Sequence, residues 1–169
     1  MKVLSVVCAF PPEDGGMGTA AYNEAIQLQE IIGIESVMVL TLPKKGEPKQ
    51  KKLSDKITVV RASTWWHCGH AGSLKEIKKH IKNADVVHLH YPFFGTHGKV
   101  ALLANKLKKP LIITYHMDVL GSLITSPFFW LYGKFATPYI VKKCTVCIAA
   151  TLRYIQNSFI AGFAQKNTD

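Results

Sequence analysis

Residues 1–18 read MKVLSVVCAFPPEDGGMG. Within this stretch, Val3 to Cys8 is a near-continuous apolar run, which is typical of a parallel strand buried on both faces. A loop from Ala9 to Gly18 follows the run. From residue 19 to 32 the apolar side chains recur at helical spacing, at Ala21, Ala25, Leu28 and Ile32. This strand, loop and helix predict the first unit of a parallel α/β sheet.

The same alternation of strands and helices continues along the chain. Short runs rich in β-branched residues predict further strands over residues 37–40, 57–60, 86–90, 111–115 and 146–149. Helices are predicted over residues 99–108 and 126–143, from Thr151 onward, and after a capping box at Ser73 to Glu76. Right-handed crossovers between such elements give a Rossmann-like parallel sheet with helices on both faces, and we expect one domain over residues 1–169.

The composition indicates a folded domain with a strong positive charge. Hydrophobic residues make up 48% of the chain and charged residues 19%, as in globular proteins. Nineteen lysines and two arginines give a net charge of +10, and six of the lysines lie in an expected loop at residues 44–56. Base readout favours arginine, so this balance argues against specific nucleic-acid binding. Attraction to an anionic surface and simple solvation of helix faces both remain open.

Three other features bear on where the protein resides. The chain is long enough to bury a core without disulfides, so its four cysteines are predicted to be free thiols. No signal peptide is recognisable at the N-terminus. The apolar stretch at residues 119–141 is interrupted by glycines and prolines, which argues against a membrane-spanning helix. We therefore expect a cytoplasmic protein, with peripheral contact to a membrane as an open alternative.

Ligands of parallel sheets bind beyond the carboxyl ends of the strands. This rule selects three loops, at Ala9–Gly18, Tyr91–Gly98 and His116–Leu120. The first loop leads into a helix N-terminus, where glycines let an anion approach backbone N–H groups. We therefore expect a phosphate near this loop, with a glycine-rich connection that binds nothing as the alternative.

Histidines mark the ends of the fourth and fifth predicted strands. Strand alternation places His88 and His90 on one face. No carboxylate or cysteine completes a recognisable zinc-ligand spacing with them and His116, so no metal site is predicted, and His88 is expected to be packed and hydrogen-bonded at the sheet edge. We assign acceptor contacts to His90 and Tyr91. His116, close to Asp118, is placed to orient a substrate hydroxyl.

Two aromatic segments allow two interpretations each. Residues 65–70, WWHCGH, are expected to form a loop that either stacks on a sugar or covers the sheet. Residues 126–135, SPFFWLYGKF, are followed by Lys142 and Lys143. This segment is expected either to lie on an anionic membrane surface or to pack on the sheet as an ordinary helix.

Four stretches, in their order and spacing, resemble the N-terminal domain of glycosyltransferase family 4, the retaining enzymes of GT-B fold. They are Pro11-Pro12 followed by Gly15-Gly16, then ADVVHLH at residues 84–90, KPLIITYHMD at 109–118 and KCTVCIAAT at 143–151. The resemblance covers most of residues 1–165. It implies a Rossmann-like, acceptor-side domain that faces a second, donor-binding domain across a cleft.

The resemblance also implies roles for individual residues. In the family the glycine loop approaches the donor's diphosphate and the transferred sugar, which here corresponds to Gly15 and Gly16 with Met17 beside them. The family's histidine after the fifth strand contacts the donor sugar, which corresponds to His116, and Asp118 stands where the family has a nearby polar or acidic residue. His116 and Asp118 are therefore the candidate catalytic residues.

The family's paired glutamates and nucleotide pocket lie in a C-terminal domain that has no counterpart in residues 1–169. We therefore expect negligible transfer by this chain alone. It would be an engineered fragment, a truncated gene product or one subunit of a split glycosyltransferase. The expected partners are a nucleotide-sugar donor, which is a substrate so that no cofactor is needed, and a glycan or lipid-linked acceptor. The alternatives are a non-catalytic glycan- or phosphate-binding module and a doubly wound domain of another class, such as a phosphate-binding regulator.

Overall fold

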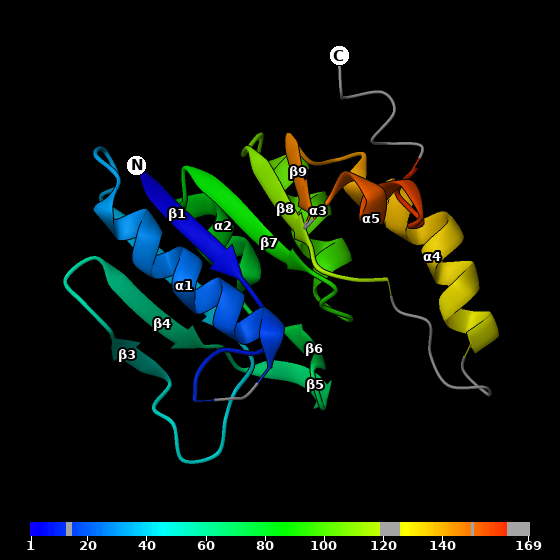
Figure 1. Cartoon of the computed structure of the whole chain (residues 1–169). Coiled ribbons are helices and arrows are strands. Elements are labelled where there is room, and N and C mark those ends of the chain that lie inside the picture. Colours follow the sequence, from blue (N-terminus) through cyan, green and yellow to red (C-terminus); the bar gives the residue numbers. More distant parts are fainter. Residues whose placement is uncertain (13–14, 119–125, 150, 162–169) are drawn as a thin grey trace.

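A seven-stranded sheet forms the centre of the described chain (Figure 1). The computed structural model describes residues 1–12, 15–118, 126–149 and 151–161. The strand order is β3-β4-β2-β1-β7-β8-β9, and all pairings are parallel except that of β3 with β4. These strands are β1 (Lys2–Val6), β2 (Ser36–Thr41), β3 (Gln50–Lys52), β4 (Ile57–Arg61), β7 (Val86–Tyr91), β8 (Leu111–Tyr115) and β9 (Val146–Ala149).

The six parallel strands follow the doubly wound order, with the direction of winding reversing between β1 and β7. The predicted Rossmann-like fold is therefore confirmed. Its helices are α1 (Gly16–Glu30), α2 (Ile77–Asn83), α3 (His97–Lys106), α4 (Ser126–Val141) and α5 (Leu152–Gln156). A separate hairpin is formed by β5 (Thr64–Cys68) and β6 (Ala71–Leu74).

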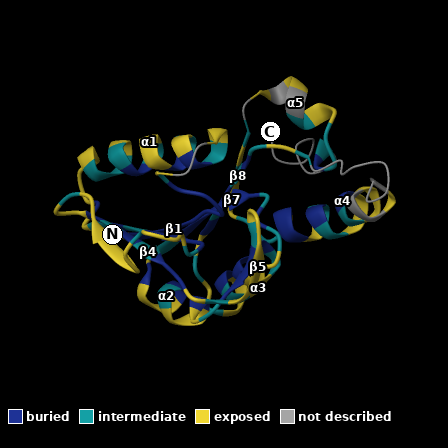
Figure 2. Ribbon diagram, turned by 90° about the horizontal axis from the view of Figure 1, so that it is seen from below, coloured by how far each residue is buried: buried dark blue, intermediate teal, exposed yellow. Residues whose placement is uncertain are grey.

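Helices cover both faces of the sheet, with α1 on one side and α2 and α3 on the other (Figure 2). The alternation of β1 explains this arrangement. Val3 and Val7 pack with Ala21 of α1, whereas Leu4 belongs to the cluster that contains Val100 of α3. A strand that buries both faces needs apolar side chains at nearly every position, which is what residues 3–8 supply.

The hairpin departs most from the sequence-based expectations. Residues 65–70 are not a simple loop, and the predicted capping box at Ser73 to Glu76 is wrong. Ser73 pairs with Trp66 across the hairpin, and Leu74 is buried with its N–H donated to Thr96 Oγ1 at 3.2 Å. Strand pairing and burial of Leu74 therefore outweigh the local capping preference, and the helix begins only after Glu76.

Two element boundaries also differ from the prediction. The lysine-rich segment at residues 44–56 contains β3, a three-residue antiparallel strand at the sheet edge. Exposed lysines on an edge strand disfavour pairing with another chain. Helix α1 begins at Gly16 rather than at residue 19, so two of the loop glycines form its first turn.

Among the described residues, no helix is both long enough and apolar enough to span a bilayer. The described part of residues 119–141 begins with α4, which lies beside α3 and contributes the buried Ile140 and Val141 to the core. The four cysteines are all free, as predicted. Cys144 and Cys147 are half-buried and pack against the core cluster.

Candidate functional site

A cavity of about 420 Å³ opens at the carboxyl edge of the sheet, beside β1 and β7, between which the strand order reverses. It is lined by Cys8, Ala9, Gly15, Gly16, Met17, Gly18, Cys68, His70, Ala71, Pro92, Phe94 and Met117. All three loops selected from the sequence contribute to it, together with the hairpin. The third loop, predicted at His116–Leu120, lies within the described residues only as far as Asp118.

A second hollow of about 320 Å³ lies at the opposite, amino-terminal edge of the sheet, beside His80 and Asn83. It is far from the loops that follow the strands. Because ligands of doubly wound sheets bind at the carboxyl edge, at the point where the strand order reverses, we take the larger cavity as the functional site.

The glycines at the start of α1 shape the cavity. Gly15 has φ 144°, a conformation that disfavours any side chain. A Cβ added at Gly16 would meet open space, whereas one at Gly18 would lie 3.2 Å from the carbonyl oxygen of Ala9. Gly18 therefore allows the helix to approach the chain after β1, and Gly15 and Gly16 leave the helix end uncovered.

The electrostatics of this helix end favour an anion. The first N–H groups of an α-helix have no intrahelical acceptor, and the helix dipole adds positive potential there. Among the described residues, no side chain caps α1, and the first turn of the helix contains no acidic residue. Met17, the third residue predicted for this site, lines the cavity and accepts a hydrogen bond from the Cys8 thiol, with the sulfurs 3.5 Å apart.

Arg61 at the end of β4 holds the loop that precedes these glycines. Its side chain is buried and donates hydrogen bonds to the carbonyl oxygens of Pro11 at 2.8 Å, Phe10 at 3.3 Å and Leu42 at 3.4 Å. A Glu47 carboxylate oxygen lies 3.9 Å from its Nε. Arg61 was not among the predicted site residues, although it is one of only two arginines and directly follows the strand predicted over residues 57–60.

Three imidazole rings stack beside the cavity. The centroids of His88 and His90 are 4.7 Å apart, and those of His90 and His116 are 5.3 Å apart. His90 Nδ1 and His116 Nε2 are hydrogen-bonded at 3.0 Å, and His88 Nε2 is hydrogen-bonded to Thr114 Oγ1 at 2.7 Å. The rings therefore form a connected row along β7 and the end of β8.

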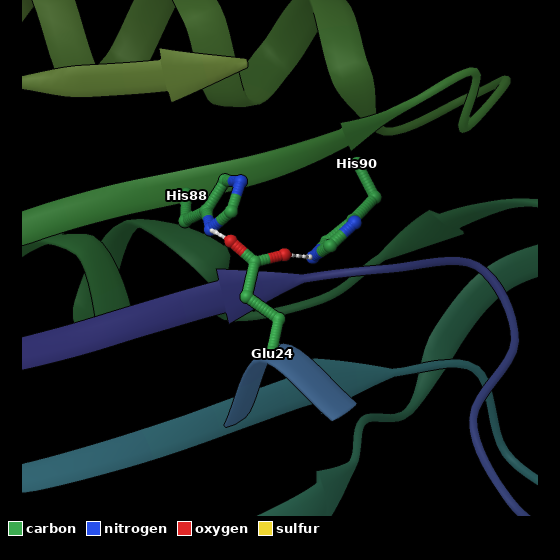
Figure 3. A group of neighbouring side chains, drawn as sticks. All are labelled: Glu24, His88 and His90. Atoms are coloured by element: carbon green, nitrogen blue, oxygen red, sulfur yellow. Dashed lines mark ion pairs between the residues drawn. The ribbon is translucent and has the colours of Figure 1, made fainter. Parts of the chain in front are cut away.

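Glu24 of α1 reaches this row from the facing helix (Figure 3). Its carboxylate oxygens lie 3.0 Å from His88 Nδ1 and 3.7 Å from His90 Nε2. A carboxylate from a distant part of the sequence thus joins these histidines in space, which the ligand spacing along the sequence did not indicate. His88 is buried and hydrogen-bonded as expected, but β7 lies inside the sheet and not at its edge.

Glu24 was detectable in principle from the sequence. The inward-facing residues of α1 include Met17 and Ala21, and Glu24 follows Ala21 by three residues on the same helical face. An acidic residue on the apolar face of a helix needs a polar partner from the sheet. The sequence analysis counted only the apolar positions of this helix and so overlooked it.

Burial keeps two of the histidines in the row neutral. Desolvation is the main cause that lowers the pKa of His90 to about 2, with positive charge on His88 and His116 adding to the effect. Desolvation also lowers the pKa of His116, against the opposing influence of Glu24. At neutral pH, His116 can therefore accept or donate a hydrogen bond as an uncharged imidazole.

Asp118 and Tyr91 do not lie together with the glycines. The Tyr115 hydroxyl donates a hydrogen bond to Asp118 Oδ1. Tyr91 is buried, stacks on Tyr115 and shares a 2.6 Å hydrogen bond with the Thr137 hydroxyl of α4. Burial raises the pKa of Tyr91. Strand alternation thus directs the side chains of His90 and Tyr91 to opposite faces, and their assignment to the acceptor stays a prediction.

The structure therefore brings together one part of the predicted site and separates another. Gly15, Gly16 and Met17 line one cavity, and His116 immediately precedes its lining residue Met117. Phe94 lies in one of the selected loops, and Cys68 and His70 lie in the segment 65–70 that was expected either to stack on a sugar or to cover the sheet, but none of the three was assigned to the site individually.

Comparison with known proteins supports this description. The family model described as Glycosyltransferase Family 4 matches residues 14–161. That range includes the glycine turn, β7 with its two histidines, His116 after β8, and β9. A search of curated proteins gave no match. The chain belongs to glycosyltransferase family 4, as an N-terminal domain of that family.

Proposed function

We propose that this chain supplies the acceptor-side domain of an enzyme that transfers a sugar from a nucleotide-sugar donor to a glycan or lipid-linked acceptor. The observation that carries the proposal is the cavity of about 420 Å³ at the switch point of the sheet, which opens onto the uncapped N-terminus of α1. Family membership supports the reaction class.

Each part of the site takes a role in this proposal. The donor's diphosphate approaches the backbone N–H groups at Gly15 to Met17, where the helix dipole stabilises negative charge. His116 holds a hydroxyl of the donor sugar, and Asp118 stays close to it through its hydrogen bond with Tyr115. His90 and Tyr91 keep their proposed acceptor role. The nucleotide base is bound by a second domain or a partner chain. The chain alone is therefore expected to have negligible sugar-transfer activity.

Filling the space in front of Gly16 is expected to abolish the function. In Gly16→Val the new side chain projects into open space, so the fold tolerates it while the cavity loses the room that the phosphate needs. We expect at least a tenfold loss of transfer, equivalent to about 1.4 kcal/mol of lost binding. The assay mixes the purified chain with an extract of the source cells and a panel of labelled nucleotide sugars, and detects products by mass spectrometry.

Gly98→Val is the matched control, because Gly98 also lies in the first turn of a helix and its added Cβ also meets open space. It should behave as the wild type. Equal transfer by the wild type and Gly16→Val would contradict the placement of the donor. Acceptor binding with no transfer in any mixture would instead support a non-catalytic glycan- or phosphate-binding module.

We also propose that α4 contacts an anionic membrane surface. Four of its apolar side chains are more than half exposed, namely Trp130, Leu131, Phe135 and Tyr139. The ammonium group of Lys134 lies 4.8 Å from the ring centroid of Trp130, and that of Lys143 lies 4.6 Å from the ring of Tyr139. Aromatic rings flanked by lysines match the headgroup region of an anionic bilayer. The segment predicted at residues 126–135 includes side chains at positions 126, 128 and 129 that lie outside the described ones.

The double variant Trp130→Ser/Phe135→Ser is expected to reduce co-sedimentation with phosphatidylserine-rich vesicles by about tenfold or more, because it removes two large apolar side chains. Trp65→Ser is the control, since Trp65 is an exposed tryptophan under a lysine on the hairpin, away from α4. Binding that does not depend on anionic lipid, or that both variants lower equally, would contradict the membrane proposal.

A further inference from the structure

The strongest cluster of titratable side chains outside the cavity lining lies between α1 and β7. The Glu24 carboxylate faces two ring nitrogens, His88 Nδ1 at 3.0 Å and His90 Nε2 at 3.7 Å. One ligand-type atom from each of the three residues lies within 4.8 Å of the others. Figure 3 shows the carboxylate directed at the space between the two rings.

The second nitrogen of each ring is already engaged. His88 Nε2 is hydrogen-bonded to Thr114 Oγ1 at 2.7 Å, and His90 Nδ1 to His116 Nε2 at 3.0 Å. When these outer nitrogens carry the protons, both inner nitrogens present lone pairs towards Glu24. Two lone pairs and a carboxylate then face one another, an arrangement that is stable only with a cation between them.

His90 Nε2 supplies a second, independent observation. The His90 side chain is fully buried, and this nitrogen has no hydrogen-bond partner among the described residues. Its distance to the Glu24 oxygen, 3.7 Å, is too long for a hydrogen bond. Buried polar atoms in folded proteins are nearly always paired, so an atom left in this state points to a missing ligand.

We propose that Glu24, His88 and His90 bind a divalent transition-metal cation, with Zn²⁺ as the best-fitting ion. Two imidazoles and one carboxylate are an established three-residue donor set for zinc, and they leave the fourth position open. Ligand atoms about 2.0–2.1 Å from a tetrahedral ion lie about 3.3 Å apart. His88 Nδ1 and His90 Nε2 lie 3.0 and 3.7 Å from the two different oxygens of the Glu24 carboxylate, distances close to that value.

The surroundings of the cluster also fit a metal site. Metal-bound histidines usually donate their other N–H to a protein acceptor, as both outer nitrogens can here to Thr114 and His116. Ser5 pairs in register with His88, and its buried hydroxyl also has no partner among the described residues. Val3, Ser5 and Val7 occupy every second position of the chain here, so their side chains point to the same face of the sheet. Val3 and Val7 pack against α1, and Ser5 therefore faces α1 as well.

The proposed ion would join α1 to β7 and act on the neighbouring site. Metal binding at His90 Nε2 places the ring proton on Nδ1, which donates it to His116 Nε2. His116 then carries its own proton on Nδ1. The metal would thus fix the tautomer of a histidine to which we assign a role at the donor sugar. The inference does not depend on sugar transfer, and it replaces the sequence-based prediction of no metal site.

Direct zinc binding tests the proposal. The full chain, stripped with a chelator, is titrated calorimetrically with Zn²⁺ and, in parallel, with Co²⁺, whose visible absorption reports a tetrahedral site. We expect one ion per chain with micromolar or tighter affinity. Glu24→Gln should weaken the affinity at least about 100-fold and remove the cobalt band. His90→Gln should do the same, and if that buried variant does not fold, Glu24→Gln decides, because the Glu24 side chain is 31% exposed.

The matched control removes the accessible thiols, which also bind zinc. The triple variant Cys68→Ser/Cys144→Ser/Cys147→Ser should retain the wild-type affinity and the cobalt band. The absence of a bound ion in the wild type would overturn the proposal and leave the cluster as a set of hydrogen bonds. Binding that survives Glu24→Gln, or that disappears in the thiol variant, would overturn it as well.

Discussion

Replacing Arg61 with methionine is expected to lower the free energy of unfolding by about 3–5 kcal/mol, because two buried carbonyl oxygens and one partly buried carbonyl oxygen lose their donor and each unpaired buried group costs about 1–3 kcal/mol. The guanidinium donates to Phe10, Pro11 and Leu42, and methionine cannot replace any of these bonds. The two carbonyls at Phe10 and Pro11 belong to the loop that leads to Gly15. The variant should therefore also disturb the entrance to the cavity.

Urea denaturation followed by circular dichroism measures this effect, as a shift of the midpoint at constant slope. Arg153→Met is the matched control, because Arg153 is the only other arginine and is exposed. That substitution should change the stability by less than about 0.5 kcal/mol. Equal midpoints for the two variants would show that Arg61 does not hold the loop.

Acid is expected to destabilise the protein through His97. This residue is buried at the start of α3, and burial lowers its pKa from the usual value of 6.5 to about 4. The backbone N–H of Phe93 donates to His97 Nδ1 at 3.1 Å, so the ring proton lies on Nε2 and is donated to the Tyr132 hydroxyl. Both ring nitrogens are thus used by the neutral form, and a second proton would displace the Phe93 N–H.

The direction of the pH effect follows from proton binding. Between pH 6.5 and about 4 the unfolded chain binds a proton at this histidine and the folded chain does not. The contribution of neutral His97 to the free energy of unfolding is therefore fully present above pH 6.5. It is lost as the pH drops towards 4, by up to about 3 kcal/mol.

The measurement is the free energy of unfolding as a function of pH for the wild type and for His97→Gln, which cannot titrate. The difference between the two curves isolates His97 from His90, whose lowered pKa acts in the same direction. The variant should be less stable at pH 7 and show a smaller loss on acidification. Parallel curves would contradict the assignment of a buried, neutral His97.

Runs of apolar residues predicted the strands well where both faces of the strand are buried, because such a strand needs apolar side chains at nearly every position. The predicted bounds of the strands at residues 111–115 and 146–149 match those of β8 and β9. The hairpin was not predictable in the same way. Its pairing of Trp66 with Ser73 and its anchoring through Thr96 depend on residues distant in sequence, whereas the capping pattern at Ser73 to Glu76 is local.

The candidate site shows the same difference between features set by local sequence and features set by distant residues. The position of the glycine turn was predictable because a glycine-rich loop follows the first strand and leads into a helix, and the carboxyl-edge rule placed the three loops together. Glu24 and Arg61 were missed because their partners come from other elements, α1 facing β7 and β4 facing the first loop. His90 and Tyr91 are adjacent in sequence but point to opposite faces, so their adjacency gave no information about a shared site.

Mapping a bound nucleotide sugar by NMR tests the central claim, that the donor phosphate meets the chain at the N-terminus of α1. The isotope-labelled chain is titrated with UDP-glucose, GDP-mannose and inorganic pyrophosphate. We expect amide shift changes concentrated at Gly15 to Gly18, Phe94 and Met117, and we expect the Gly16→Val substitution to remove them. Changes centred on His80 and Asn83 at the opposite edge of the sheet, or none near the glycines at saturating ligand, would contradict it.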